Sequence, residues 1–144
     1  MPESRNNLAY LYADRGERLD RALDLAQEAK QMLPENASVS DTLGWVLFKR
    51  GVPSAAVSYL KDAETRTDPN DASIALIRFH LAQAHAAADE DTEALAALER
   101  SLESLEAQLE AAKAQGAGSE AEPGWAAEAR EMHAKLKSQH AAAN

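Results

Sequence analysis

The sequence predicts an all-α protein of about seven helices, and its composition, its apolar spacing and its punctuation by Gly and Pro lead to this prediction. Ala, Leu, Glu, Gln, Lys and Arg dominate the 144 residues, whereas aromatic residues make up only 5%. This mixture favours helix over strand. Apolar residues recur at steps of three and four, which is the spacing of one helix face. Gly and Pro divide the pattern into segments that are each one helix long.

The first four helices are expected to form two hairpins. The segment 15–18, which contains Gly16, separates the first two helices, and the segment 34–36 closes their hairpin. Gly51 stands where helices commonly end, and Pro53 is tolerated in the opening turn of the next helix. The expected helices cover about 3–15, 19–33, 37–50 and 53–66.

Three further helices are expected after a break at 68–71, over about 71–88, 92–115 and 125–140. The fifth stops in the acidic turn 89–91, and Thr92 is the expected N-cap of the sixth. The apolar stripe of the sixth helix extends over about 24 residues, or about 36 Å. The seventh helix carries a similar stripe, so we expect it to fold back on the sixth as an antiparallel hairpin.

Charge and hydropathy exclude two classes of partner. The formal net charge is −9, and there is no cluster of Lys and Arg, so neither nucleic acid nor an anionic lipid surface is expected to bind. No apolar run approaches membrane length, and no leader-like segment follows Met1. We therefore expect a soluble chain without membrane insertion. The absence of Cys is compatible with a reducing or an oxidising compartment, which leaves the localisation open.

The sequence contains no pattern that predicts catalysis, a metal or a cofactor. His80 and His85 are five residues apart, so they lie about 140° from each other around a helix, which is poor geometry for a shared metal. The acidic turn 89–91 does not match the spacing of a calcium loop. Ser101 and Ser104 have no evident His and Asp partners. We therefore expect neither an enzyme nor a cofactor.

The sequence also contains an internal repeat. Positions of the first two hairpins recur after 34 or 35 residues in the pairs Ala22 and Ala56, Ala29 and Ala63, Leu8 and Leu43, and Tyr12 and Leu47. A third copy, displaced by 38 residues, contains Leu81, Ala82, His85, Ala94, Leu98 and Ser101. The predicted organisation is three hairpins over about 3–36, 37–70 and 71–115 within residues 1–115, a flexible linker at 116–124, and a capping helix with a tail at 125–144.

These repeats resemble the tetratricopeptide repeat (TPR) family, whose 34-residue unit contains the pattern W-x2-L-G-x2-Y, followed by A, F and P. The second repeat matches best, with Leu43, Gly44, Leu47, Gly51, Ala56, Leu60 and Ala63 in the family positions. Arg5, Ser40 and Arg78 replace the family's Trp. The resemblance covers about residues 3–103 and implies a TPR-like right-handed superhelix of helical hairpins.

The resemblance also implies a function, namely binding an extended or helical segment of another protein on the concave face built by the first helix of each hairpin. The residues expected on this face are Asn6, Tyr10, Ala13, Asp14, Asp41, Trp45, Phe48, Lys49, Leu76, Phe79, His80, Gln83 and Ala87. Trp45 and Phe48 are three residues apart and are expected to form an aromatic ledge. The alternatives are that these rings pack against a neighbouring hairpin or under the last helix, and that Asn6 and Asp41 are capping residues.

A second hypothesis is assembly through the sixth helix, as a homodimer. Steps of three and four are also typical of a coiled-coil seam, whose expected residues are Leu98, Leu102, Leu105 and Leu109. The alternative is that the seventh helix covers this stripe within one molecule. A further expectation is that the three repeats are the C-terminal piece of a longer array, and an exposed apolar patch on the first helix would be the structural sign.

Overall fold

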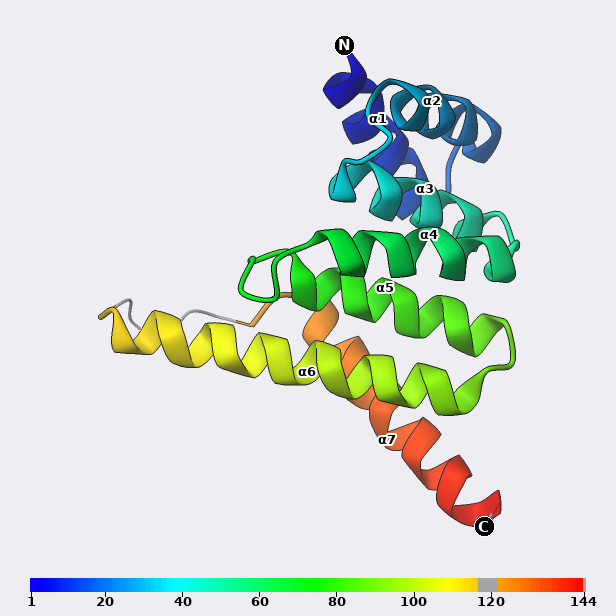
Figure 1. Cartoon of the computed structure of the whole chain (residues 1–144). Helices are drawn as coiled ribbons and strands as arrows, with labels where there is room; N and C mark the ends of the chain where they lie inside the picture. The colour runs from blue at the N-terminus through cyan, green and yellow to red at the C-terminus, as the bar shows by residue number, and fades with distance from the viewer. Residues whose placement is uncertain (117–121, 144) are drawn as a thin grey trace. The chain divides into compact units, whose positions relative to one another are not determined.

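The computed structural model describes residues 1–116 and 122–143, and these residues form seven α-helices (Figure 1). The predicted all-α fold is confirmed. The chain divides into two compact units, unit 1 from Met1 to Thr67 and unit 2 from Asp68 to Asn144. Much of the predicted flexible linker, residues 117–121, lies outside the described residues.

Unit 1 contains four helices, α1 (Pro2–Arg15), α2 (Leu19–Met32), α3 (Ala37–Lys49) and α4 (Pro53–Arg66). Gly16 and Gly51 both adopt positive φ, 67° and 82°, at the turns that close the two hairpins. Glycine has no Cβ and adopts this left-handed conformation at little cost, which explains why the chain reverses there. Asn36 caps α3, because its side chain accepts a hydrogen bond of 3.0 Å from the backbone N–H of Val39.

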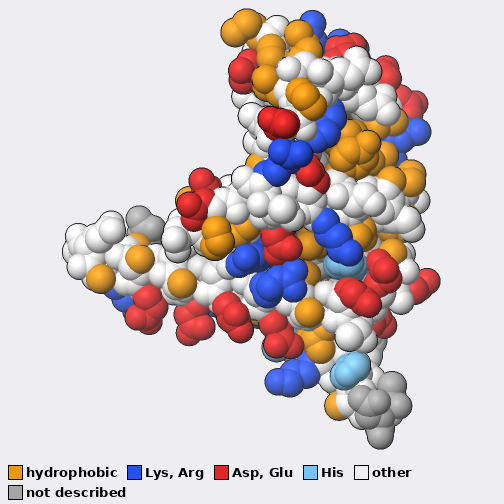
Figure 2. All heavy atoms as spheres, viewed as in Figure 1, with side chains coloured by type: hydrophobic (Ala, Val, Ile, Leu, Met, Phe, Trp, Pro, Cys, Tyr) orange, Lys and Arg blue, Asp and Glu red, His pale blue; other side chains and the backbone are white. Residues whose placement is uncertain are grey.

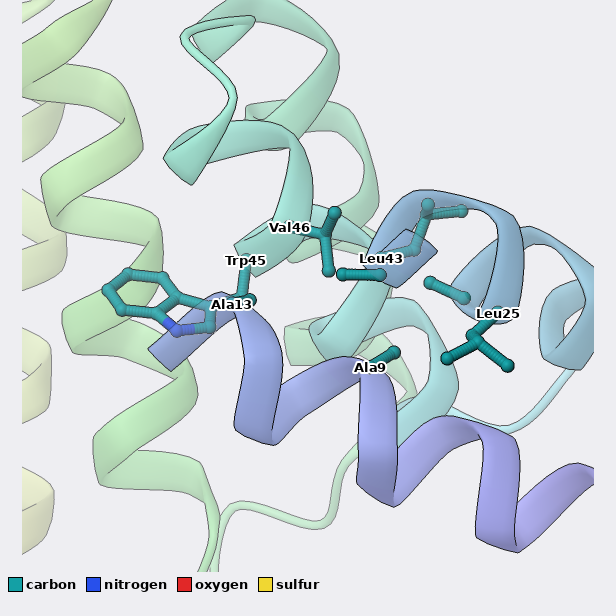
Figure 3. Close-up of a cluster of buried hydrophobic side chains, with 8 residues drawn as sticks. Ala9, Ala13, Leu25, Leu43, Trp45 and Val46 are labelled. Atoms are coloured by element: carbon teal, nitrogen blue, oxygen red, sulfur yellow. The ribbon is translucent and has the colours of Figure 1, made fainter. Parts of the chain in front are cut away.

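The core of unit 1 forms where α3 packs against the hairpin of α1 and α2. Its buried members are Ala9, Ala13, Ala22, Leu25, Ala26, Leu43, Trp45 and Val46. Figure 3 shows Leu43 and Val46 of α3 beside Ala9 and Leu25, with Trp45 at the edge of the cluster. The alanines let the helix backbones approach closely, and the larger residues fill the remaining space.

The two helices of the second hairpin approach most closely at Gly44. A Cβ atom built on Gly44 would lie 2.6 Å from Cγ of Leu60 and 3.2 Å from the backbone oxygen of Ala56. Both distances are shorter than an ordinary van der Waals contact, so α3 and α4 can cross here only because residue 44 has no side chain. Leu60, the residue against which Gly44 packs, is completely buried.

Unit 2 contains α5 (Ile74–Ala87), α6 (Asp91–Ala114) and α7 (Trp125–Ala143). The helices α5 and α6 pack as a hairpin, and α7 packs on α6, as predicted (Figure 1). The predicted start of α5 at 71 is wrong, because Asp71 accepts hydrogen bonds from the backbone N–H and the hydroxyl of Ser73 and so holds a turn.

The ends of α6 and α7 also differ from the prediction. Thr92 is not the N-cap of α6; Glu90 occupies that position, directly after Asp89, whose φ is +61°. The left-handed residue closes the turn early, so the N-cap lies two residues before the predicted position. The last helix extends to Ala143 instead of ending near 140. Among the described helices, none combines the length and the apolar character needed to cross a lipid bilayer.

Candidate functional site

The residues predicted for partner binding in unit 1 lie on α1 and α3, which contact each other. Asn6 begins this surface, but its side chain is buried, and its Nδ2 donates a hydrogen bond of 3.2 Å to Oγ of Ser38. Its Oδ1 is buried without a hydrogen-bond partner among the described residues. Asn6 therefore joins α1 to the first turn of α3, and the expectation that it faces a partner has to be corrected.

Tyr10 lies one helical turn further along α1, and its half-buried ring is close to two carboxylates. Burial, followed by the negative charges of Asp14 and Asp41, raises the pKa of Tyr10 to about 12. All three effects disfavour the phenolate. The hydroxyl of Tyr10 is protonated at neutral pH, as in any tyrosine, and the raised pKa extends the protonated range to more alkaline pH.

The aromatic pair predicted on α3 is present. The rings of Trp45 and Phe48 stack with their centroids 5.1 Å apart at 16°. The ammonium of Lys49 lies 4.9 Å from the centre of the Trp45 ring, a distance that permits a cation–π interaction. However, Trp45 is buried and belongs to the core cluster of unit 1. The expectation of an open aromatic ledge therefore needs correction. Half-buried Phe48 and exposed Lys49 are the accessible residues of this surface, and Trp45 is buried beneath it.

The residues predicted for the same role in unit 2 are less accessible. Phe79 and His80 are buried, and Gln83 is half-buried. The ring of Trp125, at the start of α7, stacks on Phe79 with the centroids 5.5 Å apart at 21°. The last helix therefore contributes to the burial of Phe79, whereas the sequence suggested such cover only for the aromatic pair of α3.

The predicted dimer seam on α6 is divided between buried and accessible leucines. Leu98 and Leu105 are buried within the molecule, and Leu105 forms a small cluster with Ala75 of α5 and Ala126 of α7. Leu102 and Leu109 are half-buried and line a surface hollow of about 330 Å³. A four-leucine seam is therefore not exposed, because α5 and α7 cover half of it, and a homodimer through α6 stays a prediction for Leu102 and Leu109 alone.

A polar network that the sequence did not reveal joins three helices of unit 1. The ammonium of Lys30 donates a hydrogen bond of 2.7 Å to Oγ of Ser40, which in turn donates one of 2.6 Å to Oδ2 of Asp62. Nε of Arg66 also bonds both carboxylate oxygens of Asp62, at 2.9 and 3.0 Å. Ser40 replaces the large aromatic residue of the repeat pattern, and the network satisfies its buried hydroxyl.

This network changes the titration of Asp62. Burial alone would raise its pKa, but the hydrogen bonds from Ser40 and Arg66, and the positive charges of Lys30 and Arg66, together lower the pKa below its usual value. A carboxylate whose pKa is lower in the folded state stabilises the fold above its unfolded-state pKa. This contribution is lost as the pH falls through the folded-state value.

We therefore expect Asp62→Asn to lower the free energy of unfolding of unit 1 by about 1 kcal/mol at pH 7. The effect is this small because Asp62 is partly solvent-exposed, which weakens its ion pairs. The difference from the unchanged chain should shrink at pH values below about 4. Urea unfolding at a series of pH values measures this difference in the free energy of unfolding. Asp24→Asn, at an exposed position of α2, is the matched control and should show no such difference. A difference that did not depend on pH would show that the charge of Asp62 is not what stabilises the network.

One comparison with known proteins found a similarity to a helical repeat protein. Within the described residues, no three His, Asp or Glu side chains come together as a metal site would require. No family model matches the chain. A TPR repeat-containing protein of Pseudomonas aeruginosa, PA4667, is 33% identical to it over 61 residues. The aligned segment covers 42% of this chain and 10% of that protein, so the chain spans about a tenth of the length of this relative. The seven helices and this similarity together indicate a TPR-like helical repeat protein.

Proposed function

We propose that this chain is a protein-interaction module and that the face formed by α1 and α3 of unit 1 binds a segment of a partner protein. The proposal depends mainly on Phe48, a large aromatic side chain that is only partly buried and stacks on buried Trp45. The similarity to a TPR repeat-containing protein supports the same class of function, because stacked helical repeats create extended surfaces for binding.

The stacked pair is suited to binding because its geometry is fixed before a partner arrives. Trp45 is buried at the edge of the core cluster of unit 1, and its ring stacks on Phe48. A ring that is already ordered loses little conformational entropy when a partner side chain packs on it. Aromatic residues of this kind contribute a large part of the binding energy in many interfaces. We therefore assign the anchoring contact of the partner to Phe48.

The polar groups of the same face suggest which segments it prefers. The carboxylates of Asp14 and Asp41 lie close to Tyr10 and contribute to the rise in its pKa. Two carboxylates beside an aromatic surface favour a partner segment that carries Lys or Arg next to an apolar side chain. Such a preference should weaken with rising salt concentration, because exposed charges are screened.

The proposal is tested by selecting binders from a random peptide library on the purified chain and measuring their affinities by calorimetry. Phe48→Ala should lower the affinity of the chain for a selected peptide by at least about 10-fold, which corresponds to about 1.4 kcal/mol of binding free energy. Tyr59→Ala is the matched control, since Tyr59 is also a half-buried aromatic residue but lies on α4. It should leave the affinity unchanged.

Circular dichroism should show that both variants have the same helical content as the wild-type chain, so that a loss of affinity is not caused by unfolding. Peptides that bind equally well to the Phe48→Ala variant but weakly to the Tyr59→Ala variant would place the site on α4 and contradict the proposal. Failure to select any peptide that discriminates between the chain and its Phe48→Ala variant would also count against it.

A further inference from the structure

Two apolar side chains of α1, Leu8 and Leu11, are exposed to solvent. Leu8 and Leu11 are 39% and 51% exposed and lie three residues apart, so they share one side of the helix. Tyr10 is two residues from Leu8 and therefore about 160° away around the helix. Figure 2 shows hydrophobic side chains gathered at the N-terminal end of unit 1, over α1.

The internal repeat shows what covers the same positions elsewhere in the molecule. Leu8 and Leu11 correspond, 35 residues later, to Leu43 and Val46 of α3. These two residues are only 3% and 0% exposed. They are buried because the preceding hairpin, α1 and α2, packs on them with Ala9, Ala13, Ala22, Leu25 and Ala26. The structure therefore contains one complete example of the interface that α1 lacks.

The charges follow the same correspondence. Arg15 at the end of α1 corresponds to Arg50 at the end of α3. The guanidinium of Arg50 is hydrogen-bonded and ion-paired with Asp20, which lies in the first turn of α2. Arg15 is exposed. A helix that packed on α1 as α2 packs on α3 would bring an acidic residue of its first turn to Arg15.

We propose that the N-terminal face, defined by Leu8, Leu11 and Arg15, stacks against another helical hairpin of the same kind as α1 and α2. The second helix of that hairpin presents small and medium apolar residues at helical spacing, with an acidic residue in its first turn. A second copy of this chain fits less well. The face of α2 that has this pattern is covered by α3 of the same molecule, so another copy could offer it only by opening its own core.

The experiment adds such a hairpin to the full chain. A second copy of residues 1–35 is joined directly before Met1, which keeps the 35-residue register, and Met1→Asn at the junction supplies the cap that Asn36 provides for α3. The urea midpoint of unit 1 should rise, and amide hydrogen exchange across the original α1 should slow. The reporter is the fluorescence of Trp45 in a Trp125→Phe background, because these are the two tryptophans of the chain.

Leu8→Glu with Leu11→Glu, placed in the original α1, is the matched control. In the unextended chain the pair should leave the midpoint nearly unchanged, because both side chains are exposed. In the extended chain it should abolish the upward shift. Arg15→Glu should reduce the shift, whereas Arg15→Lys should retain most of it.

Two results would overturn the proposal. One is an added hairpin that exchanges its amides as an unfolded chain does, with no change in the midpoint of unit 1. The other comes from light scattering of the unextended chain over a concentration series. A dimer that Leu8→Glu with Leu11→Glu dissociates would assign the N-terminal face to a second copy. A monomer throughout, together with the upward shift, is the expected result.

Discussion

Gly44→Val is expected to destabilise unit 1 by about 3 kcal/mol, and Gly44→Ala by about 1 to 2 kcal/mol. The Cβ of either residue would lie 2.6 Å from Cγ of Leu60, which is too close unless α3 and α4 move apart. Alanine also favours the helical conformation over glycine by up to about 1 kcal/mol, and this gain offsets part of the loss. Valine adds two methyl groups at the same crossing, so its cost is higher.

The measurement is urea unfolding followed by the fluorescence of Trp45 in a Trp125→Phe background. Gly124→Ala is the control, since a Cβ built on Gly124 has no neighbour within 4 Å among the described residues, and its effect should be within about 0.5 kcal/mol of zero. If Gly44→Ala stabilised unit 1, the helices would have room to separate, and the close crossing would not be needed for this hairpin.

A double-mutant cycle identifies the contact that is responsible. Leu60→Ala alone should cost about 2 to 5 kcal/mol, because Leu60 is completely buried. Combined with Gly44→Ala, the total cost should be smaller than the sum of the two single effects, since the truncated side chain no longer meets the new Cβ. Strict additivity would show that the main obstacle is the backbone oxygen of Ala56, which lies 3.2 Å from a Cβ atom built on residue 44.

The elements of the fold could be predicted because their determinants are local in the sequence. Gly16 and Gly51 occupy left-handed turns that close helices, and Asn36 caps the helix that follows it. The start of α5 could not be predicted in the same way, because the hydrogen bonds of Asp71 to Ser73 hold a turn that composition alone does not reveal. Such side-chain bonds compete with the helix only when the surrounding chain positions them.

The candidate site could be predicted only in part, because burial depends on which other elements cover a residue. The spacing of Trp45 and Phe48 correctly indicated that the two rings would meet. It could not show that Trp45 is buried, since the cluster to which Trp45 belongs includes residues of two other helices, such as Ala13 and Leu25. The partner of Ser40 was equally hidden, because Asp62 is 22 residues away in the sequence.

Trp125→Ala is expected to destabilise the packing of α7 by about 3 kcal/mol. Its ring stacks on Phe79 of α5 and lies against a cluster that includes Ala75, Leu105 and Ala126. Removing the ring exposes apolar surface on all three helices of unit 2 and leaves Phe79 without its aromatic neighbour. We place the effect at the lower end of the range for tryptophan truncation, because Trp125 is only partly buried.

Hydrogen exchange of residues 122–143 measures this effect directly. Exchange in the Trp125→Ala variant should be faster across α7, whereas α3 in unit 1 should exchange as in the unchanged chain. Trp125→Phe is the control, because a smaller aromatic ring can still stack on Phe79 and should preserve most of the protection. If α7 stays fully protected in the Trp125→Ala variant, the buried residues Ala126, Ala129 and Leu136 are sufficient to hold it.

The outcome also decides whether Phe79 can take part in binding at all. The ring of Trp125 covers one face of Phe79, so a segment that binds to this face has to displace the start of α7. The apparent affinity of such a segment is lowered by the fraction of molecules in which α7 is docked. Trp125→Ala should therefore raise the affinity for a peptide that contacts Phe79 and leave the affinity for a peptide that contacts Phe48 unchanged. This comparison distinguishes binding in unit 2 from binding in unit 1.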